Sequence, residues 1–414
     1  MWHRAAEWLS CPVCKSELRL HAFDETRIDL ADDVVAAART RGIWGPDFDR
    51  YINSGVLLCE RCKALFPITH GLPILVPYAT PTQNEFISEF ADRLAAFDAF
   101  APPSVKPVEG EQFVMSSFST EWIDYDYDGV IWDLSYADHE RRFLAEIGPQ
   151  AAEYGHGGLF VEIGCGLGLT SHFASRNLEC DALGVDLSLA VLRASIEFKS
   201  NPFLHFVQGS AFYLPLRRSL ASVVYTHGVL HHTYSTEKAV ASVASHCADG
   251  GWFYVWLYGS GSKKGSLARR IAYWLEAATR PAIARNLDSP LSRSALAALA
   301  CGYVLVNAYH RFRDGSVERY SFANALHAAR DRFTPLFAHR HDHDEVTSWF
   351  NKLGFDDIES VDWRQMPTAN QDNYRRNTGV RGRLPRVASP VGERHASAGT
   401  GAATLGRSPS FNSA

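Results

Sequence analysis

Apolar and polar positions alternate in a regular way from about residue 158 onward. Short apolar runs, which we interpret as buried strands, are separated by stretches with the spacing of amphipathic helices. The predicted strands are 159–163, 182–185, 203–207, 222–226 and 252–257. The predicted helices between them are 169–176, 189–199 and 236–247. This alternation predicts a doubly wound, mostly parallel sheet, which binds its ligands beyond the carboxyl ends of the strands.

The first part of the chain has a different organisation, built around two close cysteine pairs. Cys11 and Cys14 form the first pair, and Cys59 and Cys62 form the second. Two such pairs can direct four thiolates at one point, which is the donor set of a structural zinc ion with no open coordination position. A redox dithiol is the alternative, but two pairs favour zinc. We expect a short helix at 32–40 in the insert between them.

The residues that flank the cysteines carry a resemblance. Segments 9–15, 55–59 and 66–75 resemble the small zinc-ribbon partner protein of certain tRNA and protein methyltransferases. The resemblance covers about residues 8 to 78. It implies a ribbon that activates and stabilises a methyltransferase, here fused in the same chain.

A glycine-rich turn follows the first predicted strand of the sheet. Gly164, Cys165, Gly166 and Gly168 would let the backbone approach a ligand, and the next helix offers free amides. Glu162 lies just ahead of them. Its carboxylate would repel a pyrophosphate, whereas it suits the ammonium group of a bound amino acid.

Asp186 stands at the end of the next predicted strand, 18 positions after Gly168. A carboxylate there can bind both hydroxyls of a ribose. Capping of the helix that begins near Ser188 is the alternative role.

Four motifs together resemble the class I S-adenosylmethionine-dependent methyltransferases. They are Glu162 to Gly168, Asp186, Gly209 to Ala211 and Gly228 to Thr233. The resemblance covers about residues 155–258 and resumes at 345–361. It implies a Rossmann-like seven-stranded sheet and S-adenosylmethionine as cofactor, with the glycine turn at the methionine part and Asp186 at the ribose. The cofactor-binding residues that it implies are Glu162, Gly164, Cys165, Gly166, Gly168, Asp186, Leu187, Ser210, Ala211, Phe212 and His227.

Two positions depart from that family. Ser210 replaces an acidic residue that usually contacts the adenine amino group, and a neutral hydroxyl should hold the amine less strongly. Ser222 stands where an aspartate commonly begins the fourth strand. These departures motivate one alternative, a methyltransferase-like protein that binds cofactor or a partner without turnover.

Histidines after the fourth predicted strand are the candidates for a general base. His231 and His232 are the predicted catalytic residues, and His227 is a third candidate. Histidine titrates near neutral pH, so it can accept the proton of a hydroxyl or amine acceptor. In the alternative reading they are ordinary polar residues beside the cofactor, since many enzymes of this fold use no base.

The segment 258–340 interrupts the pattern and is predicted to form a helical acceptor lid, with helices at 267–278 and 293–300. It has 13 basic and five acidic residues, which could attract an anionic acceptor or form a solvated face. Tyr303, Tyr309, Phe312 and Tyr320 would either line an acceptor pocket or pack in a core.

Composition narrows the functional class. The chain has 414 residues, 46% of them hydrophobic, and a net charge of −5. These values exclude wholesale disorder and argue against a dedicated duplex-DNA binder. The longest apolar stretch, 295–306, is about half of what a membrane span needs. We therefore expect a soluble, cytoplasmic monomer or homodimer without a membrane partner, and nucleic acid is not the expected partner.

The predicted organisation is a zinc ribbon at 1–78, a linker with an aromatic-rich extension at 79–150, and a methyltransferase domain at 151–376. A helix at 344–353 and an antiparallel strand at 355–361 would complete its sheet. The Ser-, Gly- and Arg-rich tail 377–414 is expected to be disordered. The expected activity is methyl transfer to an oxygen or nitrogen of a small metabolite or sugar-like acceptor. A tRNA or protein acceptor is the alternative.

Overall fold

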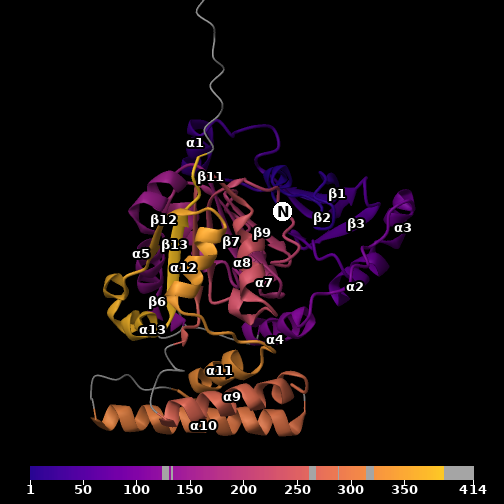
Figure 1. Cartoon of the computed structure of the whole chain (residues 1–414). Helices are drawn as coiled ribbons and strands as arrows, with labels where there is room; N and C mark the ends of the chain where they lie inside the picture. The colour runs from indigo at the N-terminus through magenta and orange to yellow at the C-terminus, as the bar shows by residue number, and fades with distance from the viewer. Residues whose placement is uncertain (124–129, 132–133, 261–266, 288, 314–320, 387–414) are drawn as a thin grey trace, which may run out of the picture.

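A seven-stranded sheet with the order β12-β13-β11-β10-β7-β8-β9 organises the computed structural model of the protein (Figure 1). The structure describes residues 1–123, 130–131, 134–260, 267–287, 289–313 and 321–386. The parallel strands are β7 (Leu159–Ile163), β8 (Asp181–Asp186), β9 (Leu204–Gln208), β10 (Ala221–His227) and β11 (Cys247–Leu257). All five lie where the sequence pattern predicts strands.

Side chains that alternate along the strands build a separate core on each face of the sheet. On β7, Leu159, Val161 and Ile163 belong to one core and Phe160 to the other. Because both faces are covered, the strands are continuous apolar runs instead of half-polar ones. The covering helices are α5 (Tyr136–Gly155), α6 (Leu169–Asn177), α7 (Ala190–Glu197), α8 (Thr236–Ala244), α12 (His343–Lys352) and α13 (Gln371–Arg376).

The last strand corrects the predicted start of the tail. Thr378–Arg383 forms β13, which pairs antiparallel with both β11 and the edge strand β12 (Asp356–Ser360). Disorder from residue 377 is therefore wrong for this segment. Its one apolar residue, Val380, is fully buried, and the Arg381 guanidinium donates to Glu359 and to the carbonyl of Glu146. Residues 387–414, also expected to be disordered, lie outside the described residues.

The N-terminal domain is an antiparallel sheet that shares a core with the large one. Its strands are β1 (Arg19–Arg27), β2 (Arg50–Cys59), β3 (Ala64–Thr69) and β4 (Leu72–Pro73), and α1 (Asp32–Thr40) is the helix predicted in the insert. Ile74 forms a parallel bridge with Gln208 at the end of β9, and Arg4 and Arg41 both pair with the buried Asp181 of β8. Figure 1 shows this domain beside β9.

The segment expected as a linker contains several helices. α2 (Pro81–Glu89) begins with a capping box at Thr80, and Phe86 packs against the ribbon strands. α3 (Ala91–Leu94) follows. α4 (Glu111–Ile123) lies at the carboxyl ends of the large sheet's strands. β5 (Val130–Ile131) and β6 (Leu134–Ser135) form a small antiparallel pair. The short 3-10 helices are η1 (His3–Glu7), η2 (Ala95–Phe97), η3 (Leu230–His232), η5 (Trp363–Gln365) and η6 (Thr368–Asn370).

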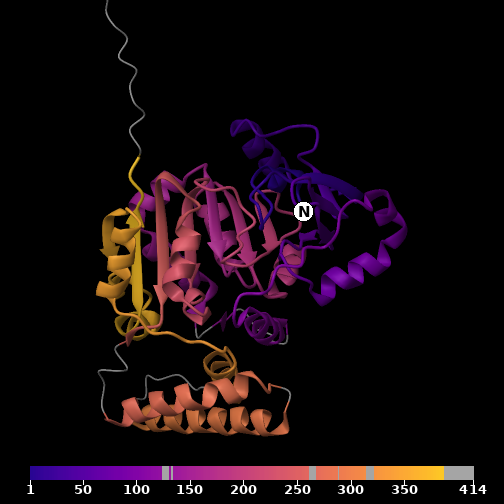
Figure 2. The ribbon, with the colours of Figure 1, turned by 45° about the vertical axis from the view of Figure 1, so that its right-hand side comes forward.

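The predicted lid is a layer of three helices, α9 (Leu267–Ala284), α10 (Pro290–Arg313) and α11 (Phe322–Phe333). The two expected helices are parts of α9 and α10, and α11 was not predicted. Figure 2 shows α9 and α10 side by side at the edge of the molecule, with α11 between them and the sheet. Within the described residues, α10 is the one helix whose length and composition would suffice to cross a membrane, over Pro290–Tyr309. The apolar stretch 295–306, on which the sequence-based expectation rested, covers only about half of this helix.

Candidate active site and metal centre

A cavity of about 300 Å³ opens at the carboxyl ends of the parallel strands. Residues that directly follow β7, β8, β9 and β10 contribute to its wall, as expected for a doubly wound sheet. The predicted site residues that line it are Glu162, Gly164, Cys165, Gly166, Asp186, Leu187, Ala211, Phe212, His227 and His232. Gly168, Ser210 and His231 are not among the described residues that line it.

Two glycines of the turn are required for different reasons. Gly164 has a φ of +79°, and a Cβ there would lie 2.1 Å from a methyl group of Val229. Gly168 also has a positive φ, and a Cβ there would meet the ring of Phe206 at 2.6 Å. Gly164 therefore shapes the cavity wall, whereas Gly168 allows the turn to pack on β9.

Glu162 is a buried carboxyl group at the cavity. Its Oε2 accepts a hydrogen bond of 2.6 Å from the Ser171 hydroxyl on α6. Burial raises the pKa of Glu162 to about 8, and the Ser171 hydrogen bond opposes this. A cationic ligand group in the cavity would favour the ionised form, because it would supply the opposite charge that the buried carboxylate lacks.

Asp186 is held in place by three hydrogen bonds, although it does not cap α7, whose N-cap residue is Leu189. Oδ2 accepts from the amide of Gly166 at 2.8 Å, and Oδ1 accepts from the amide and hydroxyl of Ser188, each at 2.7 Å. These bonds hold the carboxylate rigidly between the glycine turn and the start of α7, while it still lines the cavity. Oδ2 keeps a lone pair for a hydroxyl donor of a ligand, whereas both lone pairs of Oδ1 are used by Ser188.

Glu111 on α4 was missed by the sequence analysis. Ser210, predicted to flank the adenine, is fully buried, and its hydroxyl donates to Glu111 Oε1. Glu111 itself lines the cavity, and burial raises the pKa of its carboxyl group. The acidic group that the methyltransferase family carries at position 210 is thus brought to the same place from another element, 99 residues away in the sequence.

A buried polar network lies behind His227. The carboxylate of Glu146 on α5 accepts hydroxyl hydrogen bonds from Tyr225, Tyr254 and Tyr374. His227 Nδ1 lies 2.8 Å from Glu146 Oε1. Burial would raise the pKa of Glu146, but the charges of His227 and Arg142 lower it to about 2.

This network affects the orientation and the protonation of the His227 ring. The ring stacks on Trp256 at 4.5 Å and 13°, and burial lowers the pKa of His227. A neutral His227 ring that donates from Nδ1 to the ionised Glu146 would have Nε2 as a proton acceptor.

The other two histidines lie on the 3-10 turn η3 and face different surroundings. His232 lines the cavity, and its Nδ1 lies 2.9 Å from the carbonyl of Phe337. His231 is fully buried, its ring lies 3.9 Å from that of Tyr258, and burial lowers its pKa well below the usual value. A side chain that does not reach the cavity cannot take a proton from a ligand there, so the structure does not support His231 as the base.

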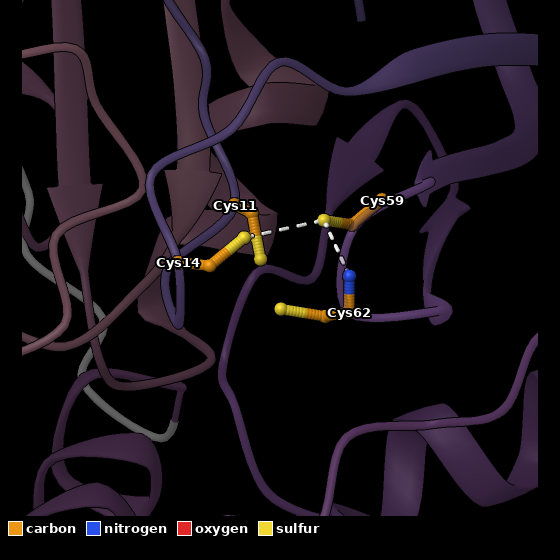
Figure 3. Close-up of side chains that lie close together, drawn as sticks. All are labelled: Cys11, Cys14, Cys59 and Cys62. Atoms are coloured by element: carbon orange, nitrogen blue, oxygen red, sulfur yellow. Dashed lines mark hydrogen bonds between the residues drawn. The ribbon is translucent and has the colours of Figure 1, made fainter.

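The four predicted zinc ligands come together at the ribbon. Figure 3 shows Cys11 and Cys14 on one loop facing Cys59 and Cys62 on the β2–β3 turn. All four sulfur atoms lie within 4.8 Å of one another, and sulfurs around a tetrahedral zinc ion are about 3.8 Å apart. Lys15 and Lys63, which follow the two pairs, both have positive φ angles. These turns aim both thiols of each pair inward, so the four cysteines fit a structural zinc ion.

Two family patterns match the chain. Residues 161–255 match the family described as "Methyltransferase domain", and residues 4–71 match "Trm112p-like protein". The first match covers β7 to β11 with the cavity residues, and the second covers the four cysteines. The chain therefore carries a methyltransferase domain together with a Trm112p-like domain.

The chain also has similar solved structures. Phosphoethanolamine N-methyltransferase 2 of Haemonchus contortus, in complex with phosphomonomethylethanolamine and S-adenosylhomocysteine, is 14% identical with a TM-score of 0.42; the match covers 69% of this chain and 62% of that one. The complex of the Haloferax volcanii Trm112 activator with a methyltransferase is 14% identical with a TM-score of 0.33, covering 61% and 96%. No curated protein matches the sequence.

The cavity at the methyltransferase domain has groups that suit each part of S-adenosylmethionine. Glu162 offers a carboxyl group for the ammonium, Asp186 for ribose hydroxyls and Glu111 for the adenine amine. Arg142 on α5, which the sequence analysis also missed, lines the cavity and is suited to the carboxylate. Only the positions of Glu162 and Asp186 relative to the glycine turn could be deduced from sequence spacing.

Proposed function

We propose that the enzyme methylates an oxygen or nitrogen atom of a small acceptor, and that His227 accepts the proton that the acceptor loses. S-adenosylmethionine supplies an activated methyl group, so the protein mainly has to align the acceptor, exclude water and take up the proton. The pair of His227 and Glu146 is the observation that carries this proposal.

His227 meets the requirements of a general base. It lines the cavity, its side chain is 20% exposed, and it is uncharged near neutral pH because burial lowers its pKa. The buried Glu146 fixes the ring orientation and stabilises the imidazolium that forms when Nε2 takes a proton. Glu146 does not line the cavity, so we assign it as a positioning residue.

His232 and Asp331 border the same cavity from the side of the helical layer. Asp331 on α11 accepts a hydrogen bond of 2.5 Å from the Tyr258 hydroxyl. We assign the acceptor to the space between these residues and His227. The size of the cavity, about 300 Å³, favours a small acceptor or a protruding group of a larger one.

The acceptor class is tested by transfer of labelled methyl groups from S-adenosylmethionine to a fractionated cell extract. Label in the small-molecule fraction supports the proposal, and label confined to RNA or protein contradicts it. With the acceptor in hand, His227→Asn should lower kcat by about 10² or more. His156→Asn is the matched control, since His156 is an exposed histidine far from the cavity wall.

Glu146→Gln distinguishes a positioning role from simple support of the fold. The amide oxygen can replace only one of the two carboxylate oxygens, so at least one tyrosine hydroxyl would lose its acceptor, and the charge that stabilises the imidazolium would be lost. We expect kcat to fall with KM almost unchanged, and the limb of the pH–rate profile that reports His227 to move to lower pH, because the Glu146 carboxylate raises the pKa of His227. An unchanged profile for both variants would remove the base assignment.

The Trm112p-like domain favours a tRNA or protein acceptor as the second candidate. It matches a family whose member in Haloferax volcanii is described as a methyltransferase activator. Here its apolar residues share a core with the catalytic sheet, which fits activation through stabilisation within one chain. Salt-dependent retention of RNA by the full chain would favour this candidate.

A further inference from the structure

The helical layer exposes an apolar stripe on α9. Leu267, Ile271, Trp274 and Leu275 are all exposed, Trp274 to 65%. Their spacing of four, three and one places them on one helix face. The opposite face carries Ile283, which packs into the small core of the layer.

α10 has a second stripe of the same kind. Leu291, Leu305 and Phe312 lie on one face, and they are exposed to 81%, 70% and 91%. Leu296 and Ala300 on the other face are buried, and Leu296 packs with Ala329 and Phe333 of α11. Only 17% of the apolar window Pro290–Tyr309 is buried. The apolar character of α10 is therefore not explained by packing within the chain.

The two stripes occur on the outermost helices of the molecule. α11 contacts α9, α10 and α4, and Figures 1 and 2 both show α9 and α10 on the side of α11 that faces away from the sheet. Tyr309 and Phe312, which the sequence analysis considered for a pocket or a core, are exposed instead. Tyr303 packs in the core of the layer, and Tyr320 lies outside the described residues.

The charges of α9 and α10 are almost all positive. The single acidic residue in the two helices is Glu276. It is buried and pairs with Arg280, Arg332 and Arg340. The exposed basic residues on and between the helices are Arg270, Arg285, Arg293 and Arg311. Among the described residues of α9 and α10, the apolar surface is edged by arginines and has no exposed carboxylate, so it complements an anionic, partly apolar surface.

We propose that the α9–α10 layer docks on the surface of an anionic lipid bilayer, with both helices in the plane of the interface. Leu, Phe and Trp side chains would enter the headgroup–acyl boundary while the arginines meet lipid phosphates. α10 packs on α11 through Leu296 and has Arg293 and Arg311 near its ends, so it lies on the bilayer and does not cross it. This inference does not depend on the proposed acceptor or base.

The docking is tested by flotation of the full chain with vesicles. We expect the chain to float with vesicles of phosphatidylcholine mixed with phosphatidylglycerol, and much less with phosphatidylcholine alone. Trp274→Asp combined with Phe312→Asp should weaken binding at least tenfold, because each places a charge in the apolar stripe. Ile196→Asp on α7, 58% exposed, is the control and should leave flotation unchanged.

Three results would overturn the docking. They are failure of the full chain to bind either vesicle, equal binding of the double variant, and loss of binding in the Ile196 control. S-adenosylhomocysteine binding by each variant verifies that it is folded. Sedimentation without vesicles tests the other occupant, a second copy of the chain. If the full chain binds no lipid and forms a dimer, and the double variant is a monomer, then the layer is a contact between two copies of the chain.

Discussion

Glu162 allows a quantitative prediction about cofactor binding. Burial raises its pKa from the ordinary 4.5 to about 8, which corresponds to about 5 kcal/mol in favour of the neutral form. Near pH 7, about nine-tenths of the carboxyl groups are therefore protonated before a ligand binds. A ligand with an ammonium group beside Glu162 selects the ionised form, so binding should release close to one proton.

The direction of the pH effect follows from the same values. Below about pH 8, the affinity for S-adenosylhomocysteine should rise with pH by up to about tenfold per unit, because more Glu162 is ionised. In Glu162→Gln this dependence should disappear, and the affinity ratio of the two proteins should change roughly fifty-fold between pH 6 and pH 8. Titration of the ligand's own amine cancels in that ratio.

The measurement is isothermal titration calorimetry in two buffers of different ionisation enthalpy. The difference in heat gives the number of protons released by each protein. Ser171→Ala serves as a second variant: it removes the hydroxyl whose hydrogen bond lowers the pKa of Glu162, so the transition should move to higher pH. If the wild type releases no proton, or if Glu162→Gln releases as many, Glu162 does not bind the ammonium.

The same pKa shift, the metal centre and Glu111 give three more predictions. The folded-state pKa of Glu162 is raised, so its contribution to stability is present below about pH 4.5 and is lost as pH rises through about 8. In alkaline buffer Glu162→Gln should therefore have a higher melting temperature than the wild type. Replacement of Cys11 and Cys59 by serine should remove about one zinc per chain by elemental analysis. The calorimetric melting of the catalytic sheet should shift too, since both domains share a core; an unchanged metal content would contradict the zinc site. Glu111→Gln should weaken S-adenosylhomocysteine binding about tenfold or more, while S-inosylhomocysteine, which has an accepting oxygen in place of the amine, should lose no affinity because the glutamine NH2 can donate to that oxygen.

The sequence predicted the strands that are buried on both faces. β7 to β11 are continuous apolar runs, because each residue meets a helix layer on one side or the other. The same pattern cannot reveal β13. Thr378–Arg383 has one apolar residue, and it becomes a strand because β11 and β12 offer unpaired edges on both sides of it.

Short-range spacing also determined part of the site. The four cysteines, the glycine turn, Glu162 and Asp186 lie within or next to local motifs, whose geometry is set by a few neighbouring residues. The strand order then decides only that their loops meet at one edge of the sheet.

The tertiary structure decided the rest, because it brings together residues that are far apart in the chain. Glu111 comes from a helix in the segment expected as a linker to meet Ser210, and Glu146 reaches His227 from α5. The choice among His227, His231 and His232 depends on which way each ring turns after β10, and the packing of Tyr258 and Trp256 sets this direction. No local pattern contains that information, since hydrogen bonds and ring contacts depend on distance in space and not along the chain.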